Sequence, residues 1–373
     1  MTYADAGVNY ENLDPFKRKC QMRAKRTYQN AERFGVYGRE ASRGESVYLM
    51  KVDANRFGEH QMYVGHVEEG LGTKNLVADA VRKITGRSHY RQIAQDTVAM
   101  IVNDPATVGI FPASVAMHVA VGSDDWFTDE ERADDLVQGW GDACDLARCI
   151  WVGGETPTLK GIIISGTVLL SGSSWGIAPK PGVMDPKNLQ AGDSIILLDS
   201  SGIHANGLSS ARKIAERLDE GYSWKLSDGR SFGEALLDPT HIYSGFIEDC
   251  LDAGIFIKYG VHITGHGWRK IMRADAEFTY ILEKVPRPQP VFDFIQKHGP
   301  VTDREAYSTF NMGAGFALFV SSHQVRGLLD FAEKHKEKYG FGAMEAGHIV
   351  RGEKKVVIKP KGIEFTANTL AVR

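Results

Sequence analysis

Cysteine is scarce in the sequence and widely scattered. The 373 residues include four cysteines, Cys20, Cys144, Cys149 and Cys250, and no two of them form a C-x-x-C pair. Structural zinc sites and the disulfide frameworks of small secreted domains both need closely grouped cysteines. The sequence therefore indicates neither kind of scaffold, and we expect reduced, mostly buried thiols in a protein of the cytoplasm.

Long apolar runs and an excess of charge are missing as well. No stretch reaches the roughly 20 apolar residues of a membrane helix, and residues 1–7 lack the basic end and apolar core of a secretory leader. The 44 basic and 47 acidic residues give a formal net charge of −3, so no basic surface for nucleic acid or an acidic membrane is indicated. We expect a cytoplasmic location and a small-molecule partner, with no nucleic acid and no membrane.

Glycine, in contrast, is abundant. The chain has 40 glycines and 43% hydrophobic residues, a composition typical of a globular protein with many tight turns. Its length fits two domains better than one core. Strand-like and helix-like segments mix without a regular βαβ repeat, which favours an α+β fold. Residues 161–170 are expected to form a central strand, residues 172–192 contain the expected junction, and the domains are placed at 1–173 and 174–373.

A glycine turn lies between an apolar run and an amphipathic one in residues 67–76. Gly70 and Gly72 lack a Cβ, so the backbone N–H groups there can approach an anion closely. Thr73 and Lys74 add a hydroxyl and a positive charge at the start of a helix. The arrangement suits a phosphate group, although the same G-x-G-T-K pattern also occurs where a turn merely joins a strand to a helix.

Polar side chains interrupt the next expected helix, residues 90–108. Asp96 and Asn103 are seven residues apart, which places them on one helical face, and Asp104 lies close beside that face. Carboxylates grouped with an amide suit a hard cation that also binds phosphate oxygens. Capping and surface solvation are the alternative explanation for the same residues.

The second half of the chain carries a polar loop, residues 199–207, between an expected strand and an expected helix. The loop gathers hydroxyls, an imidazole and an amide where the helix dipole favours an anion. His204 lies among polar turn residues rather than on an apolar face, which favours catalysis or ligand contact. A histidine that only holds its turn by hydrogen bonds is the alternative.

Together these turns resemble the phosphoribosylformylglycinamidine cyclo-ligases, the aminoimidazole ribonucleotide synthetases of purine synthesis. The likeness is collinear and covers nearly the whole chain, which is identified as a divergent member of the family. The motifs that carry it are Tyr3-Ala4-Asp5-Ala6-Gly7-Val8, Gly70-Leu71-Gly72-Thr73-Lys74, Asp96 with Val102-Asn103-Asp104, Gly153-Gly154-Glu155-Thr156, Ser200-Ser201-Gly202-Ile203-His204-Ala205-Asn206-Gly207, His262-Ile263-Thr264-Gly265 and Phe310-Asn311-Met312-Gly313-Ala314-Gly315.

The resemblance implies a two-domain α+β fold of the aminoimidazole-ribonucleotide-synthetase type, which pairs through its first domain into a homodimer. It also implies the reaction, in which ATP activates the formyl oxygen of formylglycinamidine ribonucleotide as a phosphate ester. A nitrogen of the same substrate then displaces phosphate and closes the imidazole ring. ATP and Mg²⁺ are the implied cofactors, and ATP and substrate would occupy clefts lined by both domains.

The resemblance also implies roles for individual residues of this chain. The residues that would bind ATP are Gly70, Gly72, Thr73, Lys74, Asn103, Gly153, Gly154 and Glu155. Those that would bind the metal are Glu69, Asp96 and Asp104. Those that would bind the substrate are Ser201, Gly202, His204, Asn206, Gly207, His262 and Thr264. The residues expected to be catalytic are His204, Asp96 and Lys74.

The chain departs from the family pattern at several positions. Glu69 replaces an aspartate, residues 109–112 lack an acid, and His266 replaces a glycine ahead of Trp-Arg-Lys at 268–270. Two other functions stay open. One is a related ATP-using enzyme, such as a selenophosphate synthetase or a thiamine-phosphate kinase relative, and the other is a non-catalytic nucleotide-binding paralogue. The lack of a cysteine near the N-terminus speaks against selenium chemistry, and the retained Lys74 speaks against the paralogue.

Overall fold

The computed structural model of the chain divides into two compact units, and each is described by itself. The first unit comprises Met1–Pro105 and Ile110–Gly182, and the second comprises Ala106–Gly109 and Val183–Arg373. The structure describes residues 10–38, 50–53, 55, 63–178, 183–274 and 276–370, so the family motif at residues 3–8 lies outside the described residues. The boundary that the sequence places at 173/174 falls inside strand β6, Val168–Ile177.

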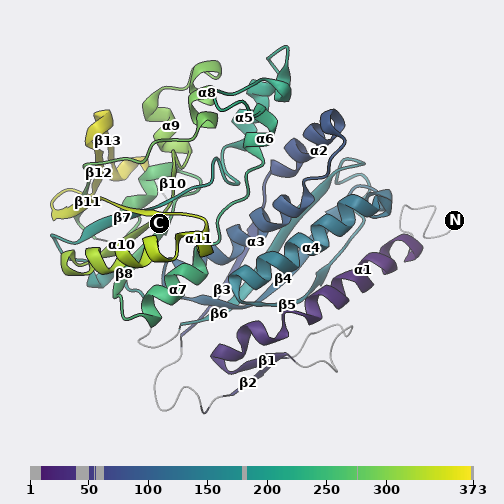
Figure 1. Ribbon diagram of the computed structural model, residues 1–373, viewed down its shortest axis with the longest axis horizontal. Coiled ribbons are helices and arrows are strands. Elements are labelled where there is room, and N and C mark those ends of the chain that lie inside the picture. Colours follow the sequence, from purple (N-terminus) through teal and green to yellow (C-terminus); the bar gives the residue numbers. More distant parts are fainter. Residues whose placement is uncertain are drawn as a thin grey trace. The chain divides into compact units, whose positions relative to one another are not determined.

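The first unit is built on a mixed sheet of four strands in the order β3-β6-β4-β5. Its remaining strands are β3 (Val64–Gly70), β4 (Phe111–Val121) and β5 (Ile150–Glu155). Its helices are α1 (Tyr10–Lys25), α2 (Lys74–Thr85), α3 (Tyr90–Ala106) and α4 (Glu130–Ala147), and α1 lies beside α4 (Figure 1). A short antiparallel pair, β1 (Val36–Gly38) and β2 (Met50–Val52), belongs to the same unit.

The alternation of side chains along β6 shows which face of this sheet is covered. Buried and partly exposed residues alternate from Val168 onward. A Cβ added at Gly172 would meet Ile101 of α3 and Trp140 of α4, so the buried set faces these two helices. The other set, which includes Leu169 at 49% exposure, faces away from them. Along β6, the sheet of the first unit therefore has one covered face and one partly exposed face, which we call the open face.

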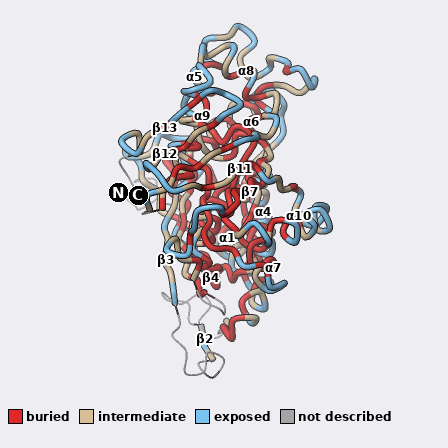
Figure 2. Tube along the Cα trace, turned by 90° about the vertical axis from the view of Figure 1, so that its left-hand side faces the viewer, coloured by how far each residue is buried: buried red, intermediate tan, exposed pale blue. Residues whose placement is uncertain are grey.

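The second unit contains a sheet of seven strands in the order β13-β12-β9-β11-β7-β10-β8. The strands are β7 (Ser194–Asp199), β8 (Ile257–His262), β9 (Phe278–Leu282), β10 (Ala314–Val320), β11 (Ala343–Arg351), β12 (Lys355–Ile358) and β13 (Ile363–Thr366). Among the described strand pairs of this sheet, β12 and β9 run parallel and the other five are antiparallel. Every residue of β10 and of the edge strand β8 is buried, and Figure 2 shows buried trace around β7, so the core lies at the β7-β10-β8 end of the sheet.

Helices surround this sheet in the second unit. They are α5 (Leu208–Ala215), α6 (Phe232–Leu236), α7 (Ser244–Asp252), α8 (Pro290–His298), α9 (Asp303–Thr309), α10 (Val325–Lys334) and α11 (Lys336–Tyr339). Within the described ranges, no helix is both long enough and apolar enough to cross a membrane.

The observed elements confirm the α+β fold class and correct one local expectation. The expected helix after the glycine turn is α2, and it ends at Gly86, whose φ of +73° terminates it. The strand expected at residues 161–170 is wrong. Gly161 and Gly166 adopt φ values of +85° and +78°, so this segment turns, and the strand begins only at Val168. Hydrophobic composition alone did not reveal that the two glycines interrupt the extended backbone.

Candidate active site

The glycine turn of the first unit ends in a buried ion pair. β3 leads into the turn and α2 begins at Lys74. The Lys74 ammonium lies 2.9 Å from Oδ1 and 2.8 Å from Oδ2 of Asp96 on α3, and both side chains are fully buried. A single buried charge is costly, whereas a paired ammonium and carboxylate neutralise each other. The structure thus brings together two expected site residues and ties the turn to α3.

The turn itself keeps the geometry of an anion site. Gly72 has a φ of +76° and no atom within 4 Å of the position of a Cβ, so open space surrounds it. A Cβ at Gly70 would make only ordinary contacts of 3.8 Å and more, so the conformation requires glycine at Gly72 alone. Thr73 at the N-cap of α2 makes no side-chain capping hydrogen bond. The first N–H groups of α2 are therefore not capped by Thr73 and can serve an anion.

The acidic residues expected at a metal do not form a cluster by themselves. Among the residues that the structure describes, no three His, Cys, Asp or Glu side chains could together hold a metal ion. Asp96 is held by Lys74, and Asn103 is fully buried. Glu69 and Asp104 are only partly buried. Mg²⁺ often takes one or two protein carboxylates and completes its shell with water and nucleotide phosphates, so these two are the carboxylates of the expected set that fit such a partial site.

The glycines at the end of β5 allow this strand to lie close to β4. Gly153 has a φ of +148°, and a Cβ at Gly154 would lie 1.9 Å from the carbonyl oxygen of Met117 on β4. Only glycine allows two strands to approach so closely. Glu155 is exposed and accepts a hydrogen bond from the N–H of Thr156 at 3.2 Å. Of the three expected ATP contacts in this turn, Glu155 is the one whose side chain can reach a ligand.

The polar loop of the second unit holds His204 inside the core. His204 is 1% exposed and has a φ of +60°, an uncommon conformation for a residue with a side chain. Its Nε2 accepts a hydrogen bond from the N–H of Ser201 at 3.2 Å, so the proton of the neutral ring is on Nδ1. The ring lies 6.1 Å from that of His241 and 6.3 Å from that of Tyr243, centroid to centroid. This geometry supports the alternative in which the imidazole holds its own turn.

Two side-chain amides join the expected substrate segments. The Asn206 Oδ1 accepts a hydrogen bond from the N–H of Gly265 at 3.1 Å, which connects the polar loop to the residues after β8. Asn311 is buried, and its Nδ2 donates to the carbonyl of Gly202 at 2.8 Å. Its Oδ1 accepts from the hydroxyl of Ser200 at 2.9 Å. Asn311 thus holds the polar loop in place, and the expected site residues do not include it because only its place in a shared motif pointed to it.

The N-terminus of α5 remains open in the same loop. Gly207 is its N-cap, with a φ of +83° and no side chain to cap the helix. A Cβ at Gly207 would lie 2.2 Å from the ring of Phe310, so the position accepts only glycine. The first N–H groups of α5 thus face a turn without a side-chain cap, which suits an anion.

The other expected substrate residues are engaged in internal contacts. The Ser201 hydroxyl donates to the carbonyl of Pro239 at 2.6 Å. His262 is 2% exposed and stacks on Phe316, with 5.9 Å between the ring centroids. Thr264 accepts a hydrogen bond from the Lys270 ammonium. These side chains therefore shape the loops, and backbone groups are what the loops offer most readily to a ligand.

Departures from the family pattern have structural roles. Trp268 is buried and donates its indole N–H to the carbonyl of Asn311 at 2.8 Å. Arg269 donates to three backbone carbonyls, those of Thr369 and Ser308 at 2.8 Å and that of His266 at 3.1 Å. His266 has a φ of +71°, a conformation that glycine adopts more easily. The substituted residues thus anchor the loop after β8 to neighbouring segments.

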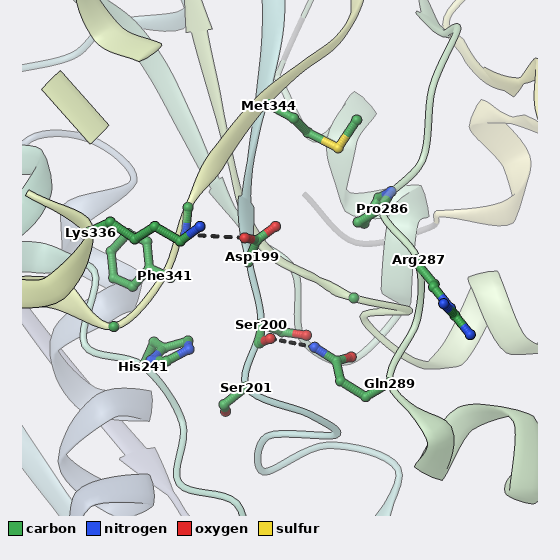
Figure 3. Close-up of a pocket in the computed structure, with 13 residues that line it drawn as sticks. Asp199, Ser200, Ser201, His241, Pro286, Arg287, Gln289, Lys336, Phe341 and Met344 are labelled. Carbon is green, nitrogen blue, oxygen red and sulfur yellow. Dashed lines mark hydrogen bonds between the residues drawn. The ribbon is translucent and has the colours of Figure 1, made fainter. Parts of the chain in front are cut away.

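A cavity of about 540 Å³ lies beside the start of the polar loop, within the second unit (Figure 3). Of the expected substrate residues, Ser201 lines it. The remaining lining comes from segments far apart in the sequence and includes Asp199, His241, Gln289 and Lys336. No local motif connects these segments, so sequence reasoning did not identify the cavity.

Two family models match the chain, one in each half. The model of the AIR synthase related protein, N-terminal domain, matches residues 55–170, and that of the C-terminal domain matches residues 190–359. Together these matches cover more than half of the chain. The two α+β units with their glycine loops therefore belong to the class of AIR synthase related proteins.

Relatives of known name extend the likeness over nearly the whole length. The chain is 34% identical over 360 residues to the phosphoribosylformylglycinamidine cyclo-ligase of Methanocaldococcus jannaschii. This match covers 94% of the chain and 92% of the relative. It is 33% identical over 366 residues to the cyclo-ligase of Carboxydothermus hydrogenoformans, with 96% and 98% covered. The chain belongs to the phosphoribosylformylglycinamidine cyclo-ligase family. The family expected from the sequence is thus confirmed, and with it an enzyme of the ligase class.

Solved structures show the same fold at much lower identity. The hydrogenase maturation protein HypE of E. coli matches with a TM-score of 0.60 and 14% identity, covering 95% of this chain and 97% of that one. The thiamine-monophosphate kinase of Stenotrophomonas maltophilia matches with a TM-score of 0.59 and 16% identity, covering 91% and 96%. A HypE structure in complex with ATP matches with a TM-score of 0.56 and 13% identity, covering 86% and 87%. These likenesses concern the fold.

Proposed function

We propose that this enzyme converts formylglycinamidine ribonucleotide into aminoimidazole ribonucleotide by closing the imidazole ring, a step of de novo purine biosynthesis. The formyl oxygen takes up a phosphoryl group from ATP, and a substrate nitrogen then attacks the formyl carbon. The bond from carbon to oxygen breaks, and phosphate leaves with that oxygen. The observation that carries the proposal is the match with named cyclo-ligases over nearly the full length of the chain.

The substrate phosphate is proposed to bind at the polar loop of the second unit. The open N-terminus of α5 at Gly207 and the link from Asn206 to Gly265 support this role. Because nucleophile and electrophile belong to one molecule, the main tasks of the protein are to hold the substrate folded and to neutralise developing charge. Asn311 holds the Gly202 carbonyl and the Ser200 hydroxyl of this loop, so the backbone N–H groups of the loop would serve both tasks without reorganising.

His204 is proposed to act on the reaction mainly by holding this loop. Its Nε2 is engaged by the N–H of Ser201, and its ring is buried. A general base needs a free lone pair within reach of the proton that it removes. Direct proton transfer by His204, which the sequence suggests, stays a prediction that needs the ring to leave this hydrogen bond.

ATP is proposed to bind at the glycine turn of the first unit. Its phosphates would lie at the uncapped start of α2, near Gly72 and Thr73, and the ion pair of Lys74 with Asp96 would hold the turn in place. Asn103 and Glu155 stay proposed nucleotide contacts. Mg²⁺, carried on the nucleotide phosphates and held by Glu69 and Asp104, would neutralise phosphate charge.

A homodimer formed through the first unit is also proposed. The open face of the β3-β6-β4-β5 sheet supports it, since Leu169, near the start of β6, is half exposed on that face. A two-fold axis places the same patch of each copy against the other, which would cover this face in both. We propose the cytoplasm as the compartment, in keeping with four free cysteines.

The direct test is to incubate the pure protein with ATP, Mg²⁺ and formylglycinamidine ribonucleotide. ADP and an aminoimidazole product should appear in equal amounts. Thiamine monophosphate and selenide, offered in parallel, should give no ATP consumption above background. ATP consumption that depends on either of these, with none from formylglycinamidine ribonucleotide, would replace the proposal with the related activity.

A further inference from the structure

The cavity beside the polar loop has the size of a ligand site. Its volume of about 540 Å³ lies within the roughly 300–1,000 Å³ of small-molecule pockets. The end of β7 and the first residues of the polar loop form one part of its wall, and residues 286–289 and the segment from α11 to β11 form others. All of these belong to the second unit. No expected ATP contact lies among its lining residues.

Charge in the cavity favours an anion. Lys336 and Arg287 are exposed lining residues, and Figure 3 shows them on opposite sides of Asp199 and Ser200. The described residues offer neither cation a carboxylate within ion-pair distance. Burial lowers the pKa of His241 to about 4, so this lining residue is neutral at pH 7. Two cations then outweigh the single carboxylate, Asp199, and leave room for a phosphate or carboxylate group.

Two hydrogen-bond acceptors in the cavity wall, on Gln289 and Asp199, favour a ligand that carries a hydrogen-bond donor. The Gln289 Nε2 donates to the carbonyl of Ser200, which directs its Oε1 as an acceptor. That Oε1 is buried, and no donor among the described residues bonds it. Asp199 Oδ2 accepts from the N–H of Gly342 at 3.1 Å, which leaves capacity at its other oxygen. Buried acceptors without donors are costly, so a ligand with N–H groups would be favoured here.

We propose that this cavity binds a small phosphate-bearing molecule with an amino group, of the size of a mononucleotide. Lys336, on one side of the cavity, would face the phosphate, Asp199 and Gln289 would accept from the amino group, and Arg287 on the other side would add positive charge. Pro286, Phe341 and Met344 supply apolar wall for a flat ring. Two sources share this chemistry: the aminoimidazole ribonucleotide made by the proposed reaction and a purine nucleotide with an amino group. The site itself does not depend on that reaction.

The position of the cavity connects its occupant to the polar loop. Ser200 and Ser201 line the cavity, and Ser201 is also hydrogen-bonded to His204. His241, another lining residue, lies against the His204 ring. A ligand in the cavity would therefore contact the same backbone that is proposed to hold the substrate phosphate, and its binding should change substrate affinity.

Calorimetric titration of the full chain tests the site, with a non-hydrolysable ATP analogue present in saturating amount to fill the other nucleotide site. The probes are AMP, IMP, ribose 5-phosphate and aminoimidazole ribonucleotide. AMP and aminoimidazole ribonucleotide should bind more tightly than the two probes without an amino group, and the tighter of the two identifies the source. Failure of both amino-bearing probes to bind would overturn the proposal.

Variants assign the binding to the cavity. Lys336→Gln should weaken AMP binding by roughly threefold to tenfold, because an exposed cation contributes modestly to affinity. The matched variant Lys334→Gln on α10 should leave the AMP affinity unchanged. Asp199→Asn keeps an acceptor for Gly342 and should remove most of the preference for AMP over IMP, about tenfold. Equal AMP affinity in Lys336→Gln, Asp199→Asn and the parent would place the probe elsewhere and refute the site. The Lys336→Gln variant should still close the ring when no AMP is added. Loss of the cavity site and absence of the proposed reaction are therefore distinguishable.

Discussion

The Lys74 ammonium lies 2.8 Å from the Asp96 carboxylate, and neither side chain is exposed to solvent. Lys74 opens α2 at the end of the glycine turn, and Asp96 lies in the middle of α3. The pair therefore fixes the proposed phosphate-binding turn to the helix beneath it. A charge pair at this position would make stability and the proposed nucleotide binding depend on the same two residues.

Asp96→Asn should destabilise the protein, because it leaves the Lys74 ammonium buried without its counter-charge. We expect a loss of about 3 kcal/mol in the free energy of unfolding, measured by urea denaturation. The double variant Lys74→Met with Asp96→Leu should recover much of this loss, since apolar residues can replace a buried pair. Its ATP turnover should stay low. Normal stability of Asp96→Asn would show that the pair is not buried as described.

His204→Asn should lower thermal stability and raise the KM for substrate, because it removes the acceptor for the N–H of Ser201. Asparagine tolerates the left-handed backbone at this position, so the change tests the side chain rather than the conformation. ATP binding should survive. A variant of normal stability whose kcat falls by roughly two to four orders of magnitude would instead assign proton transfer to the imidazole.

Gly207→Ala should cost more stability than a left-handed glycine alone explains. Its φ of +83° disfavours any side chain, and the added Cβ would meet the Phe310 ring. Gly229→Ala is the matched control, with a φ of +86° and no atom within 4 Å of the new Cβ. The control should lose about 1 kcal/mol in urea denaturation, and Gly207→Ala a further 1–3 kcal/mol, roughly, from overpacking. Equal losses of stability in the two variants would show that the contact with the Phe310 ring does not make Gly207 necessary.

Leu169→Lys should convert the proposed dimer into a monomer, because it places a charge on the open face of the first sheet. Leu146→Lys on α4 is the control, since Leu146 is exposed to a similar degree, 53% against 49%. Sedimentation velocity at micromolar concentration measures both. A monomeric parent protein, or a Leu169→Lys variant that sediments as the dimer, would reject this interface.

Sequence patterns predicted the loops well because each loop is a local feature. The G-x-G-T-K turn precedes α2, and the polar loop precedes α5, as glycine and polar residues between periodic segments indicate. The prediction of a strand at residues 161–170 was wrong because it, too, relied on local pattern alone. Their apolar side chains suggested a strand, while Gly161 and Gly166 turn the backbone.

Long-range pairing could not be predicted from these patterns. Lys74 and Asp96 each stood out as polar residues, but nothing in a single sequence shows that they pair across 22 positions. Asn311 bonds Gly202 across 109 positions, and the cavity draws its lining from several such segments. Burial of His204 is likewise a tertiary property, and its polar neighbours in sequence do not indicate it.

The fate of the formyl oxygen tests the proposed reaction most directly. The protein is supplied with ATP, Mg²⁺ and formylglycinamidine ribonucleotide whose formyl oxygen is ¹⁸O, and the released phosphate is analysed by mass spectrometry. Transfer of a phosphoryl group to that oxygen, followed by attack of the substrate nitrogen on the formyl carbon, predicts one ¹⁸O atom in each phosphate that accompanies the aminoimidazole product. Unlabelled phosphate, with the ¹⁸O found in water or retained in the substrate, would contradict the account.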